Sequence, residues 1–62
     1  MTTYKFNNAT VNVIDCACPA VDFRVVEVFD NMGMKVCDCR TSEYGQKAAA
    51  VGYAKALRFR LI

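Results

Sequence analysis

The feature of this sequence that most constrains its fold is a tight turn between two segments that favour extended structure. Residues 22–29 are rich in valine and phenylalanine, and residues 34–40 follow directly after the turn. The turn itself reads Asp30-Asn31-Met32-Gly33. Aspartate at the first position and glycine at the fourth suit a type I turn that ends in a glycine bulge with positive φ. The pattern predicts a β-hairpin with a three-residue loop, in which Asp30 pairs with Met34.

This turn also predicts a register for the hairpin. The expected pairs are Phe29 with Lys35, Glu27 with Cys37, and Val25 with Cys39. Glu27 and Lys35 would then form a cross-strand ion pair. Because side chains alternate across a strand, three other apolar residues are expected together on the opposite face. These residues are Val26, Val28 and Val36.

A strand is predicted upstream of the hairpin. Residues 9–16 contain β-branched side chains in partial alternation and no helix signal. Asn7-Asn8 before them suits a two-residue turn, because asparagine tolerates positive φ. The segment Tyr4-Lys5-Phe6 can therefore pair back as a short first arm.

A helix is predicted over residues 43–57, where strong helix formers such as alanine, lysine and leucine dominate. Thr41 or Ser42 can cap its start. Helical spacing predicts an apolar stripe that covers the sheet, made of Ala50, Ala54, Leu57 and Leu61. Residues 57–61 also alternate like a strand, so a short final strand is an alternative for the chain end.

Together these segments predict one small α+β domain spanning residues 1–62. Its expected core is a three-stranded, mostly antiparallel sheet packed against one C-terminal helix, in the order β-β-β-α. A chain of 62 residues has room for a single core. With 55% hydrophobic and 23% charged residues, the composition is that of a folded domain and not of a disordered one.

The net charge favours no particular partner, and the hydropathy argues against a membrane-spanning protein. A net charge of +2 is too small to recruit nucleic acid or an anionic membrane by itself. No apolar run reaches the roughly 18 residues that a membrane-spanning helix needs. Residues 1–8 lack the basic and apolar regions of a secretory signal, so we expect a soluble, cytoplasmic protein without a membrane partner.

The inventory of catalytic side chains argues against an enzyme. The chain has no histidine, which removes the usual general base near neutral pH. The six carboxylates are dispersed, mostly at strand ends, turns and the helix start, and no glycine-rich phosphate loop is present. We therefore expect no catalytic residues.

Four cysteines form two closely spaced pairs, Cys16 with Cys18 and Cys37 with Cys39. Residues two apart on a strand point the same way, so four thiolates could surround a zinc ion. Structural zinc sites usually have two to four residues between paired cysteines, however, and here there is one. The favoured interpretation is buried free thiols and no cofactor, with zinc and a disulfide or redox pair as alternatives.

Basic residues gather in the C-terminal third, and those with a nucleic-acid interpretation are Lys47, Lys55, Arg58 and Arg60. A hairpin followed by a basic helix, over residues 22–60, resembles the second half of double-stranded-RNA-binding domains. Such domains carry lysines at the helix start, where this chain has residues 42–46, Ser-Glu-Tyr-Gly-Gln. Nucleic-acid binding is accordingly an alternative function, and a solvated helix face is favoured.

The size and the hairpin-plus-helix layout resemble small accessory proteins encoded by bacteriophages and prophages. This resemblance implies a protein that binds or inhibits one host protein. The sequence itself gives a second reason to expect a binding partner. One helix covers only one sheet face, so Val26, Val28 and Val36 would be left exposed on the other. We therefore expect a non-catalytic protein-interaction module that uses these three valines, either with another protein or as a homodimer.

Overall fold

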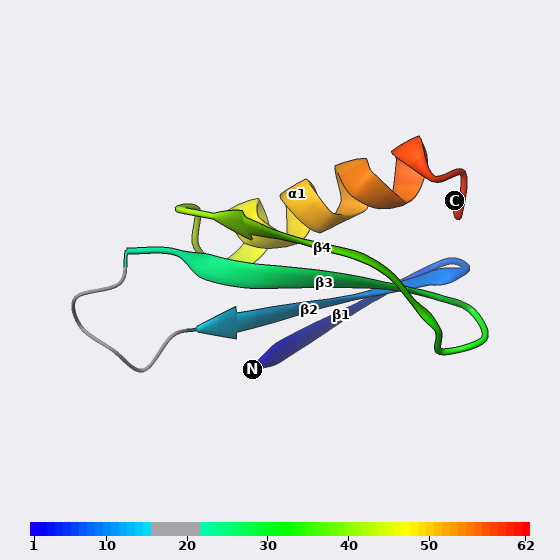
Figure 1. Cartoon of the computed structure of the whole chain (residues 1–62), viewed down its shortest axis with the longest axis horizontal. Coiled ribbons are helices and arrows are strands. Elements are labelled where there is room, and N and C mark those ends of the chain that lie inside the picture. Colours follow the sequence, from blue (N-terminus) through cyan, green and yellow to red (C-terminus); the bar gives the residue numbers. More distant parts are fainter. Residues whose placement is uncertain (16–21) are drawn as a thin grey trace.

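The computed structural model describes residues 1–15 and 22–62. It contains a four-stranded antiparallel sheet with a helix across one face, as Figure 1 shows. The elements are β1 (Thr2–Phe6), β2 (Ala9–Asp15), β3 (Arg24–Asp30), β4 (Lys35–Thr41) and α1 (Gly45–Arg58). The strands lie side by side in chain order. The expected α+β class is confirmed, but the sheet has four strands where three were expected.

The additional strand is the N-terminal arm, which is a full member of the sheet. Thr2 pairs with Val13 and Phe6 pairs with Ala9, so β1 follows β2 along most of its length. The turn between them contains Asn8 at φ 68°, a conformation that asparagine adopts more readily than most residues. The predicted turn is thus confirmed, and the arm is longer than expected.

The hairpin of β3 and β4 has the predicted turn. Gly33 has φ 83° and donates its amide to the Asp30 carbonyl at 3.1 Å, and the Asp30 amide donates to the Met34 carbonyl at 3.0 Å. The Asp30 carboxylate accepts two further backbone hydrogen bonds, from Met32 and Met34, each at 2.9 Å. Aspartate at the first turn position therefore satisfies the amides of the loop with its own side chain.

The predicted register holds for one pair and is then wrong. Phe29 pairs with Lys35 as expected, but a bulge shifts the ladder between Val28 and Phe29. The pairs beyond it are Val28 with Cys37, Glu27 with Asp38, Val26 with Cys39, and Val25 with Arg40. One extra residue in β4 reverses the face of every side chain after it relative to β3. The cysteines therefore share a face with Val26 and Val28.

That shared face is the one the helix covers. Val11, Val26 and Val28 are each 0% exposed and form the centre of the core beneath α1. The helix buries its smallest residues on them, namely Ala48, Ala49, Gly52 and Ala56. The expected stripe is wrong except at its end, because Ala50, Ala54 and Leu57 are exposed, while Leu61 packs against the core.

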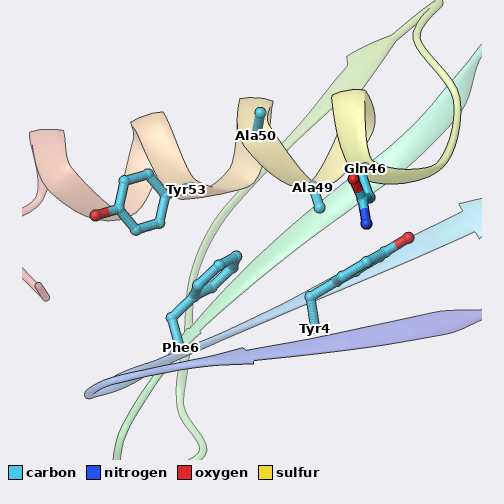
Figure 2. A pocket seen from close by; sticks show the side chains of 6 residues that line it. All are labelled: Tyr4, Phe6, Gln46, Ala49, Ala50 and Tyr53. Atoms are coloured by element: carbon cyan, nitrogen blue, oxygen red, sulfur yellow. The ribbon is translucent and has the colours of Figure 1, made fainter.

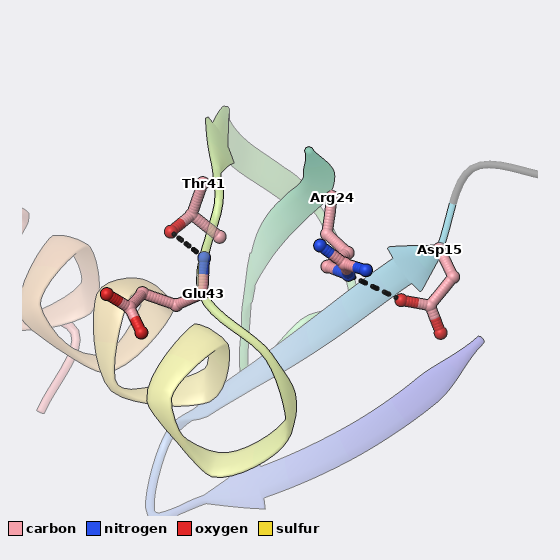
Figure 3. Close-up of polar contacts among 4 residues, drawn as sticks. All are labelled: Asp15, Arg24, Thr41 and Glu43. Atoms are coloured by element: carbon pink, nitrogen blue, oxygen red, sulfur yellow. Dashed lines mark hydrogen bonds and ion pairs between the residues drawn. The ribbon is translucent and has the colours of Figure 1, made fainter. Parts of the chain in front are cut away.

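The helix starts later than expected and ends where it was expected to end. At its start, the Thr41 hydroxyl accepts a hydrogen bond from the Glu43 amide at 3.1 Å, and the helix begins only at Gly45 (Figure 3). At its end, Arg60 has φ 59°, and the Leu61 amide donates to the Ala56 carbonyl at 2.9 Å. The Arg60 amide donates to Leu57, which completes a Schellman cap. The chain end is therefore a helix cap and not a final strand.

The opposite face of the sheet is covered by none of the described elements. Its apolar side chains, Ile14, Val25 and Phe29, are half-buried by their neighbours on the sheet itself. Among the described residues, no helix has both the length and the apolar character needed to cross a membrane.

Candidate binding groove

A groove of about 410 Å³ runs between the edge strand β1 and the helix α1. Figure 2 shows Tyr4 and Phe6 rising from β1 toward the helix above them. The lining residues are Tyr4, Phe6, Gln46, Ala49, Ala50 and Tyr53. No charged side chain is among them, so the groove suits an apolar occupant.

One aromatic contact bridges the groove. The rings of Phe6 and Tyr53 stand edge to face, with their centroids 5.0 Å apart and their planes at 61°. This arrangement is favourable for aromatic pairs because the ring edge is positive and the ring face negative. The contact ties β1 to the helix at one point and leaves the rest of the groove open.

The groove exists because the helix lies over the middle of the sheet and not over β1. Gly52 brings the helix close to the sheet, since a Cβ at this position would overlap Val11 Cγ1 and lie 3.0 Å from Val26 Cγ1. Val11 belongs to β2 and Val26 to β3, so the closest approach falls between these two strands. The helix-facing side of β1 is thereby left with only partial cover.

The helix also exposes apolar residues outside its buried face. Tyr53 is 36% exposed and Leu57 is 47% exposed. Ala50 is exposed at the groove wall, which Tyr53 also lines. An isolated small domain rarely leaves a contiguous apolar surface in water unless it is used for binding.

The strand that forms the other wall has a free backbone edge. β1 pairs with β2 on one side and is the end member of the sheet. Its outward-facing amides and carbonyls therefore have no ladder partner among the described strands. The groove and this free edge are adjacent, so an added strand could use both together.

The three valines expected to bind a partner lie elsewhere. Val26 and Val28 are fully buried beneath the helix, so neither can touch a partner directly, and their expected exposure is wrong. Val36 is half-buried next to the bulge in β4. The physical reason is that Val26 and Val28 pair with Val13 and Val11 of β2, and the helix packs on the face that these valines share.

The cysteines that the structure describes are core neighbours. Cys37 and Cys39 are free thiols, half-buried, and pack against the core cluster. Burial, with the nearby Cys39, raises the pKa of the Cys37 thiol, which keeps it protonated and weakly reactive. Cys16 and Cys18 lie outside the described residues. Within residues 1–15 and 22–62, no group of three or more metal-ligating side chains occurs.

The basic residues proposed for nucleic acid differ in their exposure and in their position along the chain. Lys47, Arg58 and Arg60 are exposed, whereas Lys55 is half-buried and close enough to Cys37 to influence its thiol. Arg60 lies in the left-handed turn after the helix. None of the four lines the groove.

The open sheet face carries ion pairs at its β4 edge. Lys35 Nζ lies 2.8 Å from Asp38 and 3.4 Å from Glu27, so the predicted pair of Glu27 and Lys35 is confirmed. The hydrogen bond to Asp38, followed by the charge of Asp38 and the contact with Glu27, raises the pKa of Lys35. Arg40 lies over the ring of Phe23 at 4.9 Å. Long charged side chains thus cover part of this face.

A second polar cluster joins the ends of β2 and β3 (Figure 3). Arg24 Nε donates to the Asp15 carboxylate at 3.0 Å, and the guanidinium lies 3.6 Å from the centre of the Tyr44 ring. Tyr44 is the residue that precedes the helix. The arginine therefore ties the helix start to the sheet, which is a structural role.

Sequence reasoning missed the groove, although two signals pointed to it. Tyr4 and Phe6 alternate with polar residues over the first six positions, which is the pattern of a strand with one apolar face. The helix carries apolar residues on more than one face, so one of them had to remain outside the core. The comparisons with known proteins add no candidate site: no protein-family model matches the chain, and no significant match was found among curated proteins or solved structures.

Proposed function

We propose that this chain is a small, non-catalytic protein-interaction module that binds through the groove between β1 and α1. The observation that supports this is the adjacency of two unsatisfied surfaces. The groove wall at Ala50 and Tyr53 is apolar and exposed, and the backbone edge of β1 beside it is unpaired. A polypeptide can satisfy both surfaces at once.

The chemistry of the groove favours a protein over other ligands. Its lining offers the amide of Gln46 and two tyrosine hydroxyls as polar groups, and no charge. Nucleotides, metal ions and anionic lipids would all require charged groups that the lining does not provide. The role proposed for small phage accessory proteins, binding or inhibiting a host protein, is compatible with such a surface.

The test compares partner capture by the tagged wild-type chain and by two helix variants. Ala50→Lys places a charge on the groove wall, whereas Ala54→Lys places the same charge on an exposed helix position outside the groove. We expect proteins retained by the wild type from a lysate of its host to be lost with Ala50→Lys and kept with Ala54→Lys, as quantified by mass spectrometry. Identical retention by all three proteins, with the untagged wild-type chain in the lysate counted among the proteins retained, would contradict a role for the groove.

A further inference from the structure

We propose that the occupant of the groove and of the β1 edge is a second copy of this chain, whose β1 pairs antiparallel with the first across a two-fold axis. This inference rests on the proposed function of the groove and names its partner. It places the dimer contact at the outer edge of β1 and the adjoining groove, whereas the sequence led us to expect it at the three valines.

The outer edge of β1 lacks the usual protection against pairing with another strand. β1 pairs with β2 in an unbroken register from Thr2 to Phe6, without a bulge and without proline. Natural proteins usually protect a free edge with prolines, bulges or several charges, because an unprotected edge pairs with other strands. Here Lys5 is the only charged side chain on the strand. The edge is therefore open to a partner strand.

The sequence of β1 is complementary to itself in one antiparallel register. A two-fold axis at Tyr4 sets Tyr4 opposite Tyr4 of the second copy and Thr3 opposite Lys5, so no like charges face each other. Moving the axis to Lys5 would oppose two ammonium groups. The sequence of the edge strand thus favours one register for pairing with itself.

Pairing of the two β1 strands creates a space between the two helices. In the joined sheet both helices lie on the same face, each over β2 and β3, because each copy keeps its own packing. With about 4.8 Å between neighbouring strands, the two helix axes would be about 19 Å apart. Helices with a diameter of about 10 Å leave a slot of similar width above the β1 pair.

The side chains that would fill this slot are already in place. Tyr4, Phe6 and Tyr53 of each copy line it, and the exposed helix residue Ala50 faces it from both walls. The two open grooves would meet across the axis and exclude water from the aromatic rings. An uncharged lining creates no repulsion between identical copies.

The experiment measures self-association of the full chain under reducing conditions, which prevent disulfide cross-links. Sedimentation equilibrium from about 1 µM to about 1 mM should show a species of twice the 6.9 kDa monomer mass. Ala50→Lys should raise the dimer Kd about tenfold or more, because two ammonium groups would enter the apolar slot. Ala54→Lys should leave the Kd unchanged.

A second measurement keeps the test independent of the variants. Amide hydrogen exchange in residues 3–5 of the wild type should slow as protein concentration rises, since strand pairing protects the outward amides. A monomer throughout the concentration range would overturn the proposal. The proposal would also be overturned by a dimer whose Kd is unchanged in Ala50→Lys and whose amides in residues 3–5 exchange as fast as in the monomer. The contact of such a dimer would lie elsewhere.

The two proposals fail in different ways. If the chain is monomeric but Ala50→Lys still loses a host protein in the capture comparison, the second copy is the wrong occupant and the groove remains a binding surface. If Ala50→Lys changes neither the dimer Kd nor the set of captured proteins, both proposals are wrong.

Discussion

Among single residues, Gly52 allows the helix to approach the sheet closely. In the sequence it weakens a helix, because glycine loses the most conformational entropy on folding. In the structure it is buried, with the side chains of Val11 and Val26 directly against its backbone. The helix axis can lie this close to the sheet only where no Cβ intervenes.

Gly52→Ala should therefore destabilise the protein although alanine is the better helix former. The added Cβ would overlap Val11 Cγ1 and lie 2.9 Å from Val11 Cγ2, so the helix or the valine must move. Overpacking of this kind costs about 1–3 kcal/mol, against a gain of about 1 kcal/mol in helix propensity. We expect a net loss in the free energy of unfolding, measured by urea denaturation. The control Ala54→Gly reports propensity alone at an exposed position, and a stabilised Gly52→Ala would show that the close approach is not required.

The valines show how far residue-level prediction reaches. That Val26 and Val28 share a face follows from alternation alone, and the structure confirms it. Their face is buried because they pair with Val13 and Val11 of β2 and the helix packs on that side, whereas the bulge in β4 decides only which β4 side chains join them. The sequence does not specify the face on which the helix packs, so it predicts the grouping and not its burial.

At the scale of elements, local chemistry was a good guide wherever one short segment determines the geometry. The turn after Asp30 and the turn at Asn8 both form as predicted, because asparagine, aspartate and glycine favour these conformations by themselves. The buried stripe of the helix was predicted less well. Ala50 and Ala48 have equal propensity and size, and only the fit of Gly52 over the sheet decides which of them is buried.

The hairpin turn gives a prediction at this scale. Gly33 has φ 83° and nothing within 4 Å of a Cβ built on it, so a substitution there is strained by conformation and not by contact. Gly33→Val should cost on the order of 1–2 kcal/mol, because a β-branched residue resists positive φ. Gly33→Asn should cost less, since asparagine tolerates this region. Thermal unfolding of both variants measures the difference, and equal midpoints would show that the turn does not depend on the left-handed conformation.

At the scale of the whole molecule, the structure is a thin two-layer body measuring 34 × 17 × 15 Å. Its helix lies across one face of the sheet (Figure 1), over β2 and β3, and meets β1 through the contact of Tyr53 with Phe6. The sequence predicts both layers, but their lateral offset arises from packing between β2, β3 and the helix. The candidate groove is a product of this offset, which is why the sequence alone did not reveal it.

The distribution of charge over the whole molecule makes the nucleic-acid alternative testable. Eight basic residues are offset by six carboxylates, and the helix cations are divided between the exposed Lys47 and Arg58 and the half-buried Lys55. At most about three or four of them can meet one duplex, so a plot of log K against log salt should have a slope of about −3 or shallower. Fluorescence anisotropy of a labelled RNA duplex, recorded at about 50 mM and about 200 mM salt, measures this slope.

We expect the affinity to stay in the nonspecific range, at a Kd of about 10⁻⁴–10⁻⁶ M, because so few cations contact few phosphates at a time. The double variant Lys47→Gln with Arg58→Gln should reduce the slope by about two if these side chains supply the contacts. Lys5→Gln is the matched control, since it removes an exposed cation from β1 and leaves the helix cations in place. A tighter complex with a slope steeper than about −4 would mean that a continuous basic surface engages the duplex. Such a result would favour nucleic-acid binding over the interaction module, because neither the groove nor the β1 edge presents the charge that it requires.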